Sequence, residues 1–152
     1  MITHVKCDIF ESGADVILHQ VNCQGVMGSG VAKQVREKFP RVFERYKSVC
    51  NLHADDREFL LGLCQYIQVG EDKFIVNLFS QKDYGYDGKQ YTDYDALEQC
   101  LEHVNAQFED KLIAIPYRMG CHRGGGDWRV VYKMIEGIFD QNDVIICEYD
   151  GG

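Results

Sequence analysis

The stretch "ADVILHQVNCQGVMGSGVAKQVREKFP", residues 14–40, contains the change of pattern that decides the fold. Its first nine residues form an apolar, β-branched run, which predicts a strand. From Gly28 onward the apolar residues recur at helical spacing, and Pro40 closes or kinks the helix they predict. The stretch therefore predicts a strand, a glycine-rich turn and a helix, which is the building unit of an α/β fold.

The same unit recurs in "KLIAIPYRMGCHRGGGDWRVVYKMIEGIF", residues 111–139, with an expected strand at 111–117 and an expected helix at 127–139. Here too the strand-to-helix junction, residues 118–126, is rich in glycine. Ligands of open α/β sheets bind beyond the carboxyl ends of strands, so we expect the two junctions to line one crevice. Neither junction carries the GxxxxGK[ST] or GxGxxG pattern.

The rest of the chain alternates in the same way. The segments before and after "GED", residues 70–72, predict a hairpin. The alternation of apolar strands with crossover-length helices favours a three-layer α/β/α sandwich with a mixed central sheet. The further strands are expected at 2–7, 63–69, 73–80 and 143–149, and the further helices at 41–50 and 93–108.

Composition indicates a single globular domain of 152 residues, with 45% hydrophobic and 26% charged residues. The formal net charge is −8, from sixteen basic and twenty-four acidic residues. This balance disfavours a broad nucleic-acid surface, whose affinity comes largely from Lys and Arg. A bound phosphate would therefore be held locally, by backbone N–H groups at helix starts.

The seven cysteines are odd in number and include no CxxC pair. They are typical of reduced thiols rather than of a disulfide framework or a zinc site, so we expect no bound metal. No apolar run approaches the roughly 18 residues of a membrane span. The start, "MITHVKCDIF", lacks a basic segment followed by an apolar one. We therefore expect a cytoplasmic protein that does not contact a membrane.

Four motifs occur in order along nearly the whole chain: "VKCDIF", "ILHQVNCQGVMGSGVAKQV", "IVNLFSQKDYGYDGKQYTDYDAL" and "IPYRMGCHRGGGDW". Together they resemble the macrodomains, in the branch of ADP-ribose-1″-phosphate phosphatases and ADP-ribosyl hydrolases. The resemblance implies a single macrodomain over residues 1–152 that needs no cofactor. Its implied partner is ADP-ribose or an ADP-ribosylated macromolecule.

The resemblance also implies an adenine subsite. Asp8 would accept a hydrogen bond from the adenine amino group, and the backbone of Ile9 would contact the same ring. A short acid after an apolar strand is also a good helix-cap or turn residue, so both roles stay open for Asp8. Tyr149, in the last expected strand, is a candidate aromatic against the adenine.

For the rest of the ligand, the resemblance implies that Asn22 faces the distal ribose, where an amide both donates and accepts. The alternative for Asn22 is an Asx turn at the strand end. Tyr84 and Tyr86 either cover the distal ribose or only pack in their loop. The remaining implied ligand-binding residues are Gly28, Ser29, Gly30, Val31, Gln81, Met119, Gly120, Cys121, His122, Arg123, Gly124, Gly125 and Gly126.

Catalysis has two versions within this branch. In the first, Lys82 attacks the anomeric carbon and Asp127 is the base, although an ungapped match from Asn77 puts Gln81 at the lysine position. In the second, water attacks a distal phosphate, positioned by Asn22 and helped by Asp127, while loop N–H groups stabilise the developing charge. Asp127 is equally suited to be the N-cap of the following helix.

Other reactive residue types have simpler interpretations. We expect His19, on an apolar strand, to be a core histidine, and Cys121 to be a packing residue rather than a nucleophile. Arg118 and Arg123 either contact phosphate or pair with carboxylates such as Asp127. The sequence therefore predicts a hydrolase acting on a distal-ribose derivative of ADP-ribose, or alternatively a non-catalytic ADP-ribose reader.

Overall fold

The computed structural model describes residues 1–149 of the chain. The six strands are β1 (Ile2–Lys6), β2 (Val16–Asn22), β3 (Cys64–Gly70), β4 (Lys73–Gln81), β5 (Leu112–Pro116) and β6 (Asp143–Glu148). The four α-helices are α1 (Gly30–Lys38), α2 (Pro40–Leu52), α3 (Tyr94–Gln107) and α4 (Trp128–Ile138). Two short 3-10 helices, η1 (Ile9–Glu11) and η2 (Arg57–Leu60), complete the elements.

The strands form one mixed sheet in the order β1-β6-β5-β2-β4-β3. Each neighbouring pair is parallel except β3 and β4, which form the predicted antiparallel hairpin. The carboxyl ends of the five parallel strands therefore lie along one edge of the sheet. This edge carries both glycine-rich junctions.

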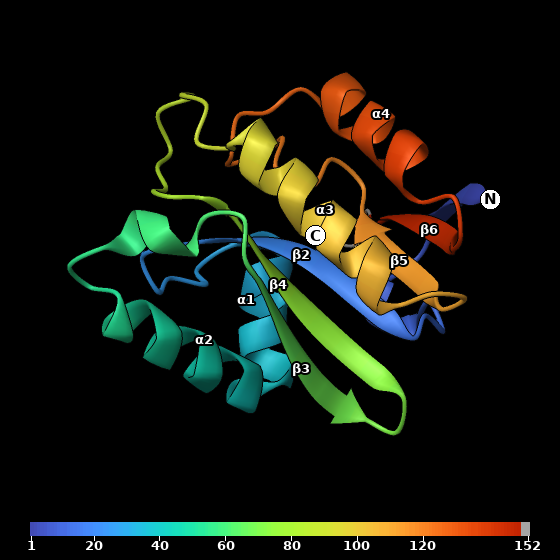
Figure 1. Cartoon of the computed structure of the whole chain (residues 1–152), viewed down its shortest axis with the longest axis horizontal. Helices are drawn as coiled ribbons and strands as arrows, with labels where there is room; N and C mark the ends of the chain where they lie inside the picture. The colour runs from blue at the N-terminus through green and yellow to red at the C-terminus, as the bar shows by residue number, and fades with distance from the viewer. Residues whose placement is uncertain (150–152) are drawn as a thin grey trace.

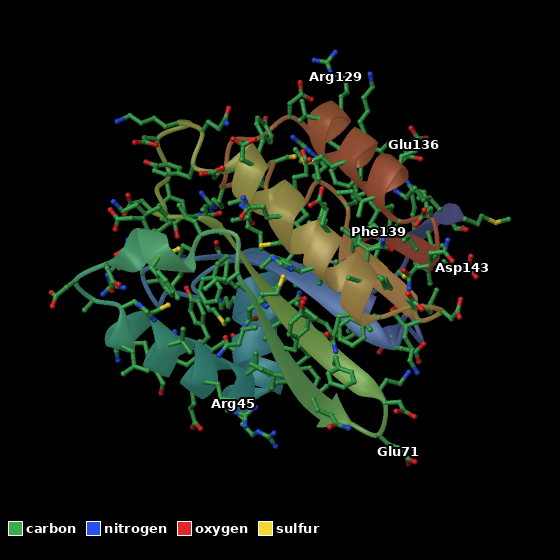
Figure 2. The ribbon with its side chains drawn as sticks, viewed as in Figure 1. Arg45, Glu71, Arg129, Glu136, Phe139 and Asp143 are labelled. Atoms are coloured by element: carbon green, nitrogen blue, oxygen red, sulfur yellow. The ribbon has the colours of Figure 1, made fainter. Side chains whose placement is uncertain are left out.

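Helices cover both faces of the sheet (Figure 1). The apolar faces of α3 and α4 pack with Val16 and Leu18 of β2, while α1 and α2 pack on the opposite face with Val21. The predicted three-layer α/β/α sandwich is confirmed. Figure 2 shows labelled charged side chains such as Arg45 and Glu71 pointing outward from these layers.

The observed boundaries of the expected strands and helices differ from the predicted ones by at most two residues, and two connections contain additional short helices. The first junction helix begins at Gly30 rather than Gly28, because Ser29 is still extended, with φ −151° and ψ 162°. Pro40 does not only end this helix: it is the first residue of α2, where its missing N–H costs nothing.

Both connections contain a short helix that the sequence pattern did not indicate. η1 follows β1 and is capped by Asp8, whose Oδ1 accepts from Phe10 N at 2.9 Å. η2 lies within the expected polar connection after α2 and buries Leu60. A 3-10 turn of three or four residues is too short for hydrophobic periodicity to reveal it.

Candidate functional site

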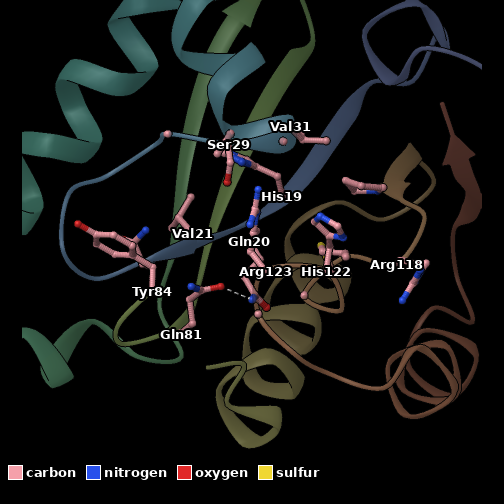
Figure 3. Close-up of a pocket in the computed structure, with 18 of the residues that line it drawn as sticks. His19, Gln20, Val21, Ser29, Val31, Gln81, Tyr84, Arg118, His122 and Arg123 are labelled. Atoms are coloured by element: carbon pink, nitrogen blue, oxygen red, sulfur yellow. Dashed lines mark hydrogen bonds between the residues drawn. The ribbon is translucent and has the colours of Figure 1, made fainter. Parts of the chain in front are cut away.

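A cavity of about 490 Å³ lies at the carboxyl edge of the parallel strands. Its walls come from the ends of β2, β4 and β5, from residues 28–32, and from six residues of the 118–124 segment. Figure 3 shows side chains from both glycine-rich junctions around this space. The prediction that the two junctions share one crevice is confirmed.

The first junction presents the start of α1 to the cavity. Gly30 opens the helix with φ +60°, and no side-chain hydrogen bond caps this end. Gly28, Ser29, Gly30 and Val31 all line the cavity, as the sequence predicted for ligand-binding residues. The first N–H groups of a helix have no partner within the helix, and its dipole favours negative charge there. This wall is therefore suited to an anion.

The second junction is held from beneath by the segment before α3. Thr92 Oγ1 donates to the carbonyl oxygen of Gly120 at 2.7 Å, and the N–H groups of Tyr91 and Thr92 donate to the carbonyl oxygen of Gly124 at 2.7 and 2.9 Å. Gly126 N also donates to Gly120 O, at 2.9 Å. The side chain of Gln20 donates to Thr92 Oγ1 at 2.9 Å.

Four residues of the loop line the cavity and have backbone N–H groups that make no hydrogen bond within residues 1–149. They are Gly120, His122, Arg123 and Gly124. Cys121, Gly125 and Gly126 do not line it, although the sequence placed them with the ligand-binding residues. Met119 does.

The charge of the cavity is opposite to that of the chain. Arg118 and Arg123 are among the lining residues, and no Asp or Glu is among those that the described part of the chain contributes. The guanidinium of Arg123 lies 4.1 Å from the ring centre of Tyr86, another lining residue. Asp127 pairs with Arg129 at 3.0 Å rather than with either cavity arginine. The site is therefore electropositive in a chain of charge −8.

Asn22 ends β2 and is 8% exposed. Its Oδ1 accepts from Gln24 N at 2.9 Å and from Val26 N at 3.3 Å, and Tyr46 Oη lies 2.8 Å away. Its Nδ2 donates to Val26 O at 2.8 Å. The Asx turn expected as the alternative role is thus present. Since the oxygen is fully engaged, Asn22 can offer a cavity ligand only the second hydrogen of its amide.

Gln81 and Lys82, the two candidates for the position of the attacking lysine, lie in different surroundings. Gln81 is 8% exposed, lines the cavity, and accepts from Gln20 Nε2 at 2.6 Å. Lys82 does not line the cavity, and its Nζ lies 3.6 Å from a carboxylate oxygen of Glu58. Of these two residues, the one that lines the cavity is therefore an amide, which is a poor nucleophile.

Asp127 is the N-cap of α4. Its Oδ1 accepts from Arg129 N at 2.9 Å, and hydrogen bonds from Arg129 hold the pKa of its carboxyl below the usual value. The residue does not line the cavity. Of the two roles open for Asp127 from the sequence, the geometry matches the cap.

Of the residues that the sequence placed beside an adenine, Tyr149 lines the cavity, as do its fellow lining residues Pro116 and Tyr117. Asp8 and Ile9 do not: Asp8 caps η1, and Ile9 is 4% exposed and packs in the core. The helix-cap role that was open for Asp8 is the one its contacts match. Its second carboxylate oxygen takes no part in the cap.

His19 is buried, as expected, but it also lines the cavity. Its Nε2 lies 2.5 Å from Asn77 Oδ1, and Asn77 Nδ2 donates to Gln65 Oε1 at 2.9 Å. With Asn77 Oδ1 as acceptor, His19 carries its proton on Nε2 and leaves Nδ1 as a proton acceptor. Nδ1 has no hydrogen-bond partner in the described chain, and burial lowers the pKa of the ring to about 4.

Cys121 behaves as the packing residue that the sequence predicted. Its side chain belongs to the core cluster beneath α3 and α4, and burial raises the pKa of its thiol to about 11. A thiol with a raised pKa is a weak nucleophile at neutral pH.

Residues 1–149 contain no group of three or more His, Cys, Asp and Glu side chains arranged to hold a metal ion. Over the same residues, the helices are too short or too polar to cross a bilayer.

The fold and the cavity define an α/β/α domain with an anion-binding crevice at its parallel strand ends. No family model matches the chain. The chain is similar to the macrodomain of DarG from Mycobacterium tuberculosis, with a TM-score of 0.80 and 25% identity over 97% of each chain. The macrodomain resemblance inferred from the four motifs is confirmed, and the chain is a relative of the macrodomains.

Two curated relatives carry activity names. A protein of Mycobacterium tuberculosis named DNA ADP-ribosyl glycohydrolase is 28% identical over 159 aligned positions, which cover all of this chain and 43% of the relative. A protein of Debaryomyces hansenii named ADP-ribose 1″-phosphate phosphatase is 37% identical over 68 positions, covering 41% of this chain and 38% of the relative. The chain thus corresponds to less than half the length of either relative.

Proposed function

We propose that this protein binds ADP-ribose in the cavity and hydrolyses a bond at its distal ribose. The observation that carries the proposal is the cavity itself: two walls of unpartnered N–H groups, two arginines, and no lining carboxylate within residues 1–149. A diphosphate between two sugars presents two anionic faces to two such walls. The names of the macrodomain relatives supply the ligand class.

The two ends of the cavity differ in their lining residues, and this difference would fix the orientation of the ligand along the strand ends. The aromatic wall that includes Tyr117 and Tyr149 suits the adenine, and the wall that includes Asn22, Gln81 and Tyr84 suits the distal ribose. Between them, residues 28–31 and 120–124 would hold the diphosphate. Asn22 would donate one hydrogen bond to a ribose hydroxyl, because its oxygen is already engaged.

For the chemistry, the geometry supports attack by water better than attack by lysine. Lys82 pairs with Glu58, and Asp127 caps α4, both outside the lining residues. His19 lines the cavity, but its unpartnered Nδ1 is buried and burial lowers the pKa of the ring to about 4, so water would be positioned by Asn22 rather than deprotonated by His19. Loop N–H groups would stabilise the charge that develops on a departing or transferred phosphate.

A non-catalytic reader of ADP-ribose is the second candidate. It is favoured by one specific observation, which is that neither Lys82 nor Asp127 lines the cavity. A reader needs the two anion-binding walls but no base. The two candidates therefore predict the same binding and differ in turnover.

One experiment separates them. ADP-ribose is titrated into the protein by calorimetry, with ribose 5-phosphate as the control ligand, and ADP-ribose-1″-phosphate is then followed by phosphorus NMR. Binding of ADP-ribose with phosphate release supports the hydrolase. Perturbed diphosphate signals without release exclude the phosphatase and leave removal of ADP-ribose from a macromolecule, or a reader, as the function. No binding of ADP-ribose overturns both.

A further inference from the structure

A series of side-chain hydrogen bonds supports the second glycine-rich loop, and of its members only Gln20 lines the cavity. Ser80 Oγ donates to Gln20 Oε1 at 2.7 Å, Gln20 Nε2 donates to Thr92 Oγ1 at 2.9 Å, and Thr92 Oγ1 donates to Gly120 O at 2.7 Å. Ser80 is fully buried and Thr92 is 3% exposed. Figure 3 shows Gln20 beside Gln81 beneath the loop.

The donor and the acceptor of each hydrogen bond in this series are fixed. A threonine hydroxyl has one hydrogen, and Thr92 gives it to Gly120, so Thr92 can only accept from Gln20. The amide of Gln20 must then turn its nitrogen toward Thr92. The same nitrogen donates to Gln81 Oε1 at 2.6 Å, so both amide hydrogens of Gln20 are used.

The loop is seated closely on this support. A Cβ on Gly124 would clash with Thr92 Oγ1, and a Cβ on Gly120 would lie 2.8 Å from Gln20 Oε1. Gly120 has φ +77°, a conformation that glycine adopts freely. The glycines therefore allow the loop to approach Thr92 and Gln20, in addition to leaving room for a ligand.

The consequence concerns which side of each peptide faces the cavity. The carbonyl oxygens of Gly120 and Gly124 are both drawn toward residues 91–92. Carbonyl oxygens on the cavity side would repel an anion, whereas the unpartnered N–H groups there attract one.

We propose that Thr92 is a positioning residue, oriented by Gln20, which turns the carbonyl oxygens of the second loop away from the cavity so that its N–H groups meet the ligand. Thr92 is not among the lining residues, so it acts through the loop. The effect of Thr92 on ligand binding rests on the proposed function, because that effect presumes an anion in the cavity.

The test compares Thr92→Val, which keeps the shape and removes the hydroxyl, with Thr92→Ser, which keeps the hydroxyl. In the free protein, amide hydrogen exchange is measured by NMR at Gly126 and Tyr91, which donate to the loop carbonyls. We expect Thr92→Val to raise both rates while the rate at Ile113, a buried residue of β5, is unchanged. ADP-ribose affinity should fall about tenfold in Thr92→Val and stay within about twofold in Thr92→Ser.

A second variant keeps the proposal testable if Thr92→Val does not fold. Gln20→Met removes the amide oxygen and nitrogen at similar side-chain length; because Gln20 also lines the cavity, the decisive readout of this variant is exchange at Gly126, which should rise. Wild-type exchange and affinity in either folded variant, or equal losses in Thr92→Ser and Thr92→Val, would overturn the proposal. If the wild-type protein binds no ADP-ribose, the proposed function fails, and the positioning role is decided by the exchange rates alone.

Discussion

Replacing Gly30 by Ala tests whether the start of α1 is built for a ligand. Gly30 has φ +60°, and a Cβ there would meet no atom within 4 Å. Steric exclusion within the protein is therefore not the issue, and the cost lies in the backbone conformation. Alanine either keeps this conformation under strain or relaxes and turns the helix's first N–H groups away from the cavity.

Each outcome has a magnitude. A left-handed conformation costs a residue with a Cβ about 1–2 kcal/mol. Alanine recovers about 0.4–1 kcal/mol by restricting the unfolded chain. The strained variant should therefore lose up to about 1.6 kcal/mol of unfolding free energy, or up to about 6 °C in Tm for a domain of this size. A relaxed variant would instead lose a charge-assisted hydrogen bond of about 1.5–3 kcal/mol, which is about 10- to 100-fold in affinity for ADP-ribose.

The assay combines urea denaturation with a calorimetric titration of ADP-ribose. Gly137→Ala is the matched control, since Gly137 lies in α4, is exposed, has no neighbour within 4 Å of its Cβ and is not left-handed. It should gain up to about 1 kcal/mol in stability and keep its affinity. If Gly30→Ala matched the wild-type protein in both stability and affinity, the assignment of this helix start to an anion would be refuted.

Three other variants test the remaining parts of the site. Because burial lowers the pKa of His19 from 6.5 to about 4, the unfolded chain takes up a proton first as the pH falls. Stability should therefore decline between about pH 6.5 and 4, and His19→Gln should flatten that part of a urea-midpoint series. Lys82→Ala should leave any phosphate release from ADP-ribose-1″-phosphate unchanged in phosphorus NMR, and a lost activity would restore the lysine mechanism. Arg123→Ala should weaken ADP-ribose binding about fivefold or more by calorimetry. Arg129→Ala is the control and should leave the affinity unchanged, because Arg129 pairs with a carboxylate outside the cavity. Equal losses of affinity in the two variants would contradict the electropositive site.

Much of the fold could be predicted because its signals are local. The apolar runs, the helical spacing and the two glycine-rich junctions each lie within about fifteen residues, and together they gave the elements, the layers and the shared crevice. The two 3-10 helices escaped because three or four residues show no period.

The support of the second loop could not be predicted, for a different reason. Thr92 and Gln20 are 72 positions apart in the chain, and each is an ordinary polar residue in its own segment. Their roles exist only because the end of β2 and the segment before α3 meet beneath the loop. The position of Lys82 was ambiguous for the same reason, since one residue at a strand end decides which side chain faces the cavity.

The absence of a lining carboxylate within residues 1–149 links the binding and the chemistry of this site. A carboxylate base beside a diphosphate would oppose the charge that the two N–H walls attract. A neutral imidazole would avoid that conflict, because it can accept a proton without adding negative charge. His19 lines the cavity with a neutral ring, but Asn77 engages one of its nitrogens and the other is buried. A cavity without a lining acid and without an accessible His19 nitrogen therefore favours a water that is positioned for attack, with loop N–H groups stabilising the phosphate charge, over a water that is deprotonated by a base.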